Sequence, residues 1–165
     1  MSEGITFLGA VAEEKFRDQT GAEKPHENFE GDAILRGHPV EIKKANGGTV
    51  NQVRPARYTT LAIYIEREDT WFVIPPHEVV KLATLRSRGQ HTENPFECMA
   101  LTVKHLPSRF KLVRPTPQQL LARALSAIAE GEEHIDVKNK MATVIGECSR
   151  MAAKHLTQVR RLLGS

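Results

Sequence analysis

The sequence has little cysteine, no long apolar run and no recognisable targeting segment. Its two cysteines, Cys98 and Cys148, are isolated from each other; they lack the paired spacing of a zinc site and are expected to fill core space without forming a disulfide. The seven histidines show no ligand spacing either. No apolar run approaches the length of a membrane span, and the N-terminus lacks the basic and then apolar pattern of a signal peptide. We therefore expect a cytoplasmic protein with no membrane partner.

Length and charge add two further expectations. A chain of 165 residues without an internal repeat is most simply one domain, 1–165, with a core of its own. The net charge is only +3, but residues 1–30 hold seven acids against three bases, whereas residues 81–120 hold seven bases against two acids. The acidic opening is typical of a solvated helix and loop. The basic stretch could follow a phosphate backbone or be an ordinary basic surface.

The most informative segment is a predicted hairpin that carries two acids and a lysine. Ala33 to Leu35 and Val40 to Ala45 read as strands, and Arg36-Gly37-His38-Pro39 supplies turn residues between them. Side chains alternate along a strand, so Glu41 and Lys43 share one face. Asp32 joins that face if the face lies beside the start of the first strand.

These three side chains have a clear chemical use. Mg2+ takes oxygen ligands and keeps several waters, so one or two carboxylates plus a substrate phosphate make a sufficient site. A nearby ammonium can hold the attacking water or stabilise the charged transition state, which makes phosphodiester hydrolysis the natural reaction. The competing interpretation is an ordinary charged sheet face, because Glu-x-Lys alone is a common pattern.

The rest of the first two thirds of the chain reads as one helix, further strands and loops. The segment from Val50 to Tyr58 is polar and basic, and Pro55 allows only a first-turn or broken helix there. Periodicity and turn residues predict the other elements: a helix over Ile5 to Phe16, strands over Leu61 to Ile65, Thr70 to Ile74 and Cys98 to Val103, and a short helix over His77 to Leu85.

Beyond residue 106 the chain predicts helices. Gln118 to Ala129 and Val137 to Leu163 have helical periodicity, and the second carries a long apolar stripe. We expect 1–106 to form an α/β catalytic core and 107–165 a helical extension. The stripe has two interpretations that are equally favoured: a subunit interface in a homodimer, which includes Met151 and Leu156, or a helix pair with Gln118 to Ala129 within one chain.

The order of a helix, a hairpin with Asp and Glu-x-Lys, a polar segment and more strands resembles the PD-(D/E)xK, or restriction-endonuclease-like, nuclease superfamily over roughly residues 5–85. The resemblance implies an α/β fold with a mixed β-sheet flanked by helices. It also implies that Asp32 and Glu41 bind Mg2+, with Mn2+ as a substitute, and that Lys43 assists catalysis. Gly31 stands where the motif name has proline.

The resemblance also suggests supporting residues. Glu13 or Glu14 on the first helix would support the metal site, although the residues by themselves favour a solvated helix face for either. Four further residues are expected to contact DNA: Lys44, Gln52, Arg54 and Arg57. For the last three the reason is positional, because a Gly47-Gly48 loop leads from the lysine strand into their segment. Arg54 and Arg57 could instead pair with the acidic N-terminal region.

The sequence thus predicts a Mg2+-dependent DNA endonuclease of restriction type. Such an enzyme acts on double-stranded DNA, and two sites related by a twofold axis are the simplest way to cut both strands. A Holliday-junction resolvase or other structure-selective nuclease would use the same three residues. A non-catalytic DNA-binding or assembly protein with this fold is the alternative of a different class, since a fold by itself does not define an activity.

Overall fold

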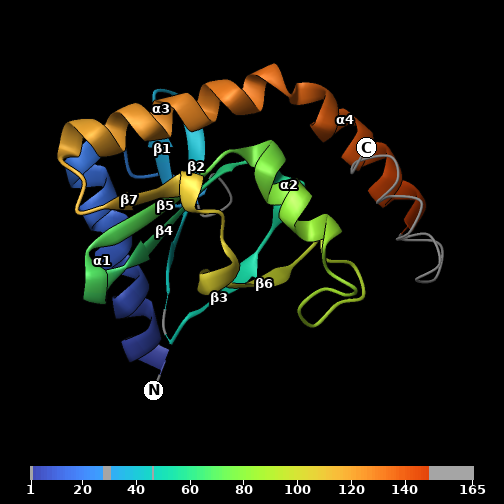
Figure 1. The fold of residues 1–165 in the computed structure, drawn as a ribbon, viewed down its shortest axis with the longest axis horizontal. Coiled ribbons are helices and arrows are strands. Elements are labelled where there is room, and N and C mark those ends of the chain that lie inside the picture. The colour runs from blue at the N-terminus through green and yellow to red at the C-terminus, as the bar shows by residue number, and fades with distance from the viewer. Residues whose placement is uncertain (1, 28–30, 46, 149–165) are drawn as a thin grey trace.

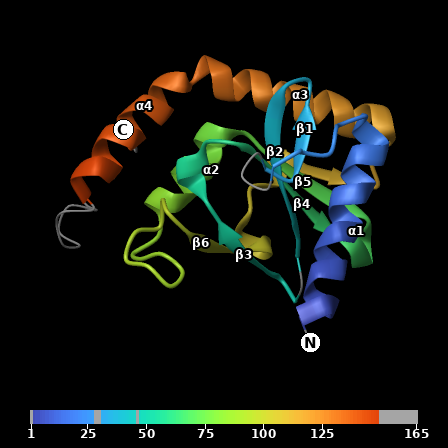
Figure 2. The same cartoon turned by 180° about the vertical axis from the view of Figure 1, so that it is seen from behind.

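The computed structural model describes residues 2–27, 31–45 and 47–148, and it has mixed α/β architecture (Figures 1 and 2). The helices and strands of this part of the chain are α1 (Ser2–Thr20), β1 (Ala33–Leu35), β2 (His38–Lys44), β3 (Thr49–Val53), β4 (Thr60–Ile65), β5 (Thr70–Ile74), α2 (Pro76–Thr84), β6 (Met99–Thr102), β7 (Lys111–Val113), α3 (Pro117–Glu133) and α4 (Ile135–Cys148). Short 3-10 turns lie between them: η2 (Pro55–Arg57), η3 (Glu66–Glu68), η4 (Val103–His105) and η5 (Ser108–Phe110). Among these residues no helix is long and apolar enough to cross a membrane.

The strands form two sheets. The main sheet has five strands in the order β1-β2-β4-β5-β7, and a separate two-stranded sheet pairs β3 with β6. The β2–β4 pair is parallel, and the other pairs of the main sheet are antiparallel. A parallel pair needs a crossover connection; here the crossover contains β3 and η2. The expected mixed sheet flanked by helices is therefore present.

Each face of the main sheet is covered by apolar side chains from different elements. On one face, Val40 and Ile42 of β2 join a cluster with Ala12 and Phe16 of α1 and with side chains of α3. The opposite face carries a second cluster, built from alternate residues of β4 and β5 with α2 and the small sheet. Period-two alternation thus gives the sheet two buried faces. In Figure 2, α1 runs beside the β1–β2 end of the sheet, whereas α3 packs across β4 and β5.

Most of the predicted elements are confirmed. The first helix is longer than expected at both ends, and the Leu61 to Ile65, Thr70 to Ile74 and His77 to Leu85 elements are correct to within one residue. The hairpin is also present, but its turn is shorter, because His38 and Pro39 already belong to β2 and only Arg36 and Gly37 remain in the turn. Both turn residues have positive φ, 48° and 83°, the backbone that a tight two-residue hairpin requires.

No strand is predicted for Val50 to Tyr58, but the first half of this segment forms one. Val50 and Val53 are buried in β3, which pairs with β6, while Gln52 lies between them with φ 55°. The register shifts between the two valines, as a β-bulge requires. The bulge breaks the alternation, which is why the segment looks irregular in sequence. Pro55 does open a short 3-10 turn, as predicted.

The C-terminal part of the described chain is integrated with the core. The segment expected to be a helical extension begins with η5 and β7, which pairs with β5 in the main sheet. Helix α3 then buries Leu120, Ala124 and Ala127 against the α1 side of the sheet. The division at residue 106 therefore does not separate the core from an extension.

Helix α4 does not fold back along α3 as a helix pair would, but continues from its end and curves away (Figure 1). Its Met141 is buried in the cluster that contains α2, with Val137 packed against it. The first part of the apolar stripe is thus buried against other residues of the same chain. Met151 and Leu156, on which the interface hypothesis depends, lie outside the described residues.

Gly131 is the point where α3 crosses the start of α2. A Cβ at Gly131 would lie 2.7 Å from two ring carbons of Pro76. We expect Gly131→Ala to lower the free energy of unfolding by about 1–3 kcal/mol, because a rigid ring must move. Gly9→Ala is the control, since a Cβ there meets nothing closer than 4.0 Å and alanine is the better helix former by about 1 kcal/mol. Denaturant unfolding measures both, and equal effects would contradict the close contact.

Candidate functional site

Asp32 is held directly beside the second strand of the hairpin. Its backbone N–H donates to the carbonyl of Val40 at 3.1 Å, and its carboxylate Oδ2 accepts the N–H of Ile42 at 2.7 Å. Asp32 is therefore hydrogen-bonded to both residues that flank Glu41 in the sequence. Arg17 of α1 donates to the Asp32 carbonyl oxygen at 3.3 Å, which holds the same residue from the other side.

Gly31 explains why proline is absent from this position. Its φ is 100°, whereas proline is fixed near −65°. A Cβ would also lie 3.3 Å from the Pro39 side chain and 3.3 Å from the Val40 carbonyl. The close approach of the two strands just before Asp32 thus requires glycine, and the departure from the motif name has a local structural cause.

Glu41 and Lys43 meet on one face of β2, as alternation predicts. The Lys43 Nζ lies 3.4 Å from Glu41 Oε1. Glu41 is 6% exposed, and this burial raises the pKa of its carboxyl, with the negative charge of Asp32 adding to the rise and Lys43 opposing it. Lys43 is more accessible, with a quarter of its side chain exposed. The buried acid is thus neighbour to a second acid and to an accessible ammonium.

Of Glu13 and Glu14, the two candidate acids on α1, Glu13 lies near enough to Asp32 and Lys43 to interact with both charges. Burial raises the pKa of Glu13, the charge of Asp32 raises it further, and Arg17 and Lys43 oppose the shift. Arg17 lies 3.9 Å from Glu13, one helical turn away. Glu14 is exposed on another face of the helix. Ala12 and Phe16 of this helix pack against the sheet. Glu13, the next residue after Ala12, therefore lies at the edge of the buried face of the helix.

Glu13, Asp32 and Glu41 carry carboxylate oxygens, the ligand type that a hard divalent cation takes. Asp32 raises the pKa of both of its neighbours, so the group carries mutual repulsion that a bound cation would relieve. In the part of the chain that is described, no three acid, histidine or cysteine side chains stand close enough to share one ion. Two carboxylates with a substrate phosphate remain sufficient for Mg2+, and Asp32 and Glu41 are the pair that would hold it.

The expected DNA contacts lie in different surroundings. Arg57, at the end of η2, is near enough to Glu41 to lower the pKa of that carboxyl. Gln52 and Arg54 are exposed, and neither Arg54 nor Arg57 forms an ion pair within residues 2–27, 31–45 and 47–148. The ammonium of Lys44 instead pairs with Glu66 on the α1 side of the sheet.

One residue of this site was not anticipated. Arg17 touches both the Asp32 backbone and the Glu13 carboxylate. The spacing of Glu13 and Arg17, four residues apart in a predicted helix, was the available signal, because such residues are neighbours on a helix surface. Its contact with Asp32 depends on how α1 packs on the hairpin and carries no signal in the sequence.

Comparisons with protein-family models, with curated proteins and with solved structures found no match to this chain.

The buried carboxylate of Glu41 should cost stability near neutral pH. The pKa of the Glu41 carboxyl is raised in the folded chain, so the folded chain binds the carboxyl proton more tightly than the unfolded chain does. The protonated carboxyl therefore stabilises the fold fully below the ordinary pKa of 4.5, and this stabilisation is lost as the pH rises through the raised pKa. We expect Glu41→Gln to raise the melting temperature near neutral pH by about 2–4 °C, the change that about 1 kcal/mol produces. Thermal unfolding over a range of pH measures it.

The difference between this variant and the unmodified protein should shrink as the pH falls toward 4.5. Glu14→Gln is the matched control, because it removes an exposed carboxylate of the same charge and should change little at any pH. A Glu41→Gln protein that melts below the unmodified one at neutral pH would show that the carboxylate stabilises the fold.

Proposed function

We propose that this protein is a Mg2+-dependent endonuclease that hydrolyses phosphodiester bonds in DNA, with Asp32, Glu41 and Lys43 at the reacting centre. The observation that carries the proposal is the meeting of two carboxylates and an ammonium beside one strand: Asp32 spans Glu41 through its bonds to Val40 and Ile42, and Lys43 lies 3.4 Å from Glu41. Mn2+ would replace Mg2+, since both take oxygen ligands.

Each residue has a distinct part in this proposal. A bound divalent cation supplies an activated water, a polarised phosphoryl oxygen and compensation of developing charge. Asp32 and Glu41 would hold the cation, with the Ile42 N–H keeping the Asp32 carboxylate in place. Lys43, partly exposed, can donate to the attacking water or to a phosphate oxygen. Glu13 would support the site from α1, and Arg57 from the crossover.

The burial of Glu41 argues against a non-catalytic protein of the same fold. A buried carboxylate with a raised pKa opposes folding near neutral pH, and glutamine or a small apolar residue would fit the sheet face at lower cost. Such a cost is typical of sites kept for function. A structure-selective nuclease such as a Holliday-junction resolvase is the second candidate, because it would use the same residues. Homodimerisation remains a prediction, and light scattering of the intact protein tests it.

The direct test is incubation with plasmid DNA, a four-way junction and single-stranded DNA, in Mg2+ and in EDTA. Cleavage of plasmid into discrete fragments, dependent on Mg2+, favours restriction, and selective cutting of the junction favours the resolvase. Binding without cleavage of any of the three would favour the non-catalytic alternative.

Metal binding has a readout that does not depend on cleavage. Mn2+ at about 100 times its Kd should stabilise the fold by about 2.7 kcal/mol, or about 5–10 °C in melting temperature for a chain of this size. We expect Asp32→Asn and Glu41→Gln to lose both this shift and cleavage, because each removes a ligand charge. Glu13→Gln should reduce the shift and Glu14→Gln should not. An Asp32→Asn protein that keeps the shift and the activity would refute the assignment.

Lys43 should act in the chemistry, and its neighbour Lys44 should not. We expect Lys43→Ala to lower the cleavage rate by about 100-fold or more, the usual effect of removing one transition-state donor. Lys43→Arg should also fail, because a planar guanidinium does not replace a compact ammonium. Single-turnover cleavage measures these rates. Lys44→Ala is the control, since Lys44 is paired with Glu66, and equal losses in the two alanine variants would contradict the assigned roles.

A further inference from the structure

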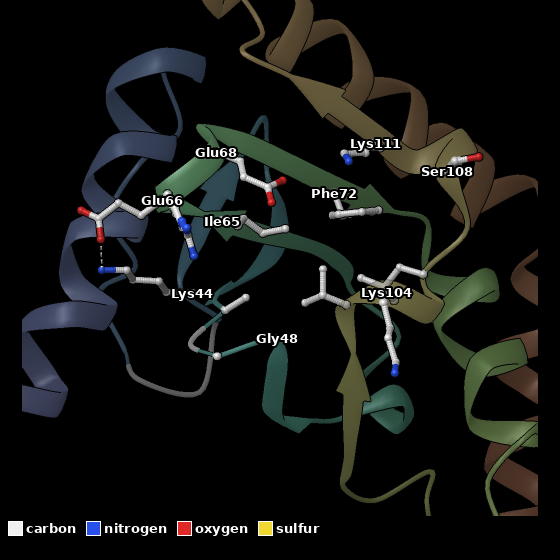
Figure 3. Close-up of a pocket in the computed structure, with 14 residues that line it drawn as sticks. Lys44, Gly48, Ile65, Glu66, Glu68, Phe72, Lys104, Ser108 and Lys111 are labelled. Carbon is white, nitrogen blue, oxygen red and sulfur yellow. Dashed lines mark ion pairs between the residues drawn. The ribbon is translucent and has the colours of Figure 1, made fainter.

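A groove of about 780 Å³ opens at the end of the strand that carries Glu41 and Lys43. Its walls come from the residues after β2, from the β4–β5 turn and from the segment between β6 and β7 (Figure 3). Figure 3 shows Lys44 and Glu66 on the α1 side, and Lys104, Ser108 and Lys111 on the opposite side. A volume of this size accommodates a nucleotide-sized group.

The groove lies on the same face of the main sheet as the proposed catalytic side chains. Glu41, Lys43 and Ala45 follow one another at every second position, so they share a face. Ala45 lines the groove and packs against the second apolar cluster. It stands two residues beyond Lys43, about 7 Å along the strand, and a nucleic-acid strand advances about 3.4 Å per nucleotide. A strand bound at the site would reach the groove within about two nucleotides.

The floor of the groove is apolar. Ile65 and Phe72 line it from the central strands, and Val103 and Leu106 line it from the segment after β6. A duplex presents phosphates and sugars to a protein surface and keeps its bases stacked inside. An unpaired strand exposes the faces of its bases, which bind apolar and aromatic side chains. An apolar floor therefore fits a base that has left the duplex.

The rim of the groove is cationic. Arg67, Lys104 and Lys111 are exposed and form no ion pair within the described part of the chain. Two glutamates also line the groove, but Glu66 is engaged by Lys44, which leaves Glu68 as the one acid against three unpaired cations. Cations above an apolar floor are the combination that binds a single nucleic-acid strand.

We propose that this groove binds unpaired DNA next to the scissile phosphate, with Lys104 and Lys111 on its phosphates and a base against Phe72, Val103 and Leu106. The inference rests on the proposed nuclease function and narrows its substrate to duplexes with a single-stranded tail or an unpaired segment beside the cut.

Fluorescence anisotropy in EDTA tests the inference without cleavage. The ligands are a blunt duplex, the same duplex with a single-stranded tail, and the tail strand alone. The unmodified protein should bind the tailed duplex more tightly than the blunt one, and a Lys104→Ala, Lys111→Ala double variant should lose this advantage. For the tail strand, the slope of log affinity against log salt should fall by about 0.7 for each phosphate contact removed. A 2-aminopurine base in the tail reports whether a base enters the groove.

Arg36→Ala is the matched control. Arg36 is exposed in the β1–β2 turn, at the opposite end of a seven-residue strand and so about 23 Å from the groove. It should leave the tail advantage unchanged. Unchanged binding in the double variant, or an equal loss for blunt and tailed duplexes, would overturn the inference.

The two proposals can fail separately. Metal-dependent cleavage of blunt duplex with no contribution from a tail would overturn the groove inference and leave the nuclease proposal in place. Tail binding that depends on Lys104 and Lys111, with no cleavage of any substrate in Mg2+ or Mn2+, would support the groove and overturn the nuclease.

Discussion

The position of the candidate site depends on one hydrogen bond, from the Ile42 N–H to the Asp32 carboxylate. Strand β1 is three residues long and begins at Ala33, so it offers no backbone partner to Ile42 on that side of β2. A strand N–H left without a partner inside a protein is costly. The carboxylate at 2.7 Å fills the place that a longer strand would have taken. Asp32 is thereby fixed beside Glu41 by the same requirement that completes the edge of the sheet. Gly31 and Arg17 support this arrangement. Gly31 permits the close approach of the two strands, and Arg17 donates a hydrogen bond to the Asp32 carbonyl oxygen.

A second constraint follows from which face of β2 carries the charges. The face shared by Glu41 and Lys43 continues onto β4 and β5 as Leu61, Ile63 and Phe72, all buried in the second cluster. Glu41 is therefore placed at the border of an apolar layer, and its burial raises its pKa. Close packing stabilises the fold, but it disfavours the charged form of Glu41. The sheet face therefore cannot provide both tight packing and a well-solvated carboxylate. In the proposed nuclease, the same border would place the catalytic groups where water is limited, which would strengthen their electrostatic effect on a bound phosphate. In the proposed nuclease, the cost in stability and the gain in chemistry would thus have one physical cause.

Local pattern predicted the elements that alternate or repeat regularly, and it failed where pairing is distant or irregular. The hairpin, β4, β5 and α2 follow from apolar periodicity and turn residues, since each is defined by neighbours in sequence. The pairing of β3 with β6 joins residues about fifty positions apart, and the bulge at Gln52, with φ 55°, hides the alternation of Val50 and Val53. Strand β7 is only three residues long, which is too short for a pattern. At the site, alternation predicted the meeting of Glu41 and Lys43. The choice between Glu13 and Glu14 was open, because it depends on which face of α1 packs against the sheet.

The parallel pairing of β2 and β4 connects the site to the groove. A hairpin would have turned the chain back at the end of β2 and covered that end with a tight turn. A parallel neighbour instead requires the chain to leave the sheet and return, and here it leaves through Gly47 and Gly48, two residues of the groove wall. The small sheet holds this exit in place, because the Gly48 carbonyl accepts the Val103 N–H at 2.9 Å. The end of β2 therefore stays open on the face that carries Lys43, with a wall already anchored by β6. In open α/β sheets, ligands bind where such crossovers leave space at the carboxyl ends of strands. The topology that separates β2 from β4 along the chain also leaves room, beside Glu41 and Lys43, for the DNA strand that we propose as substrate.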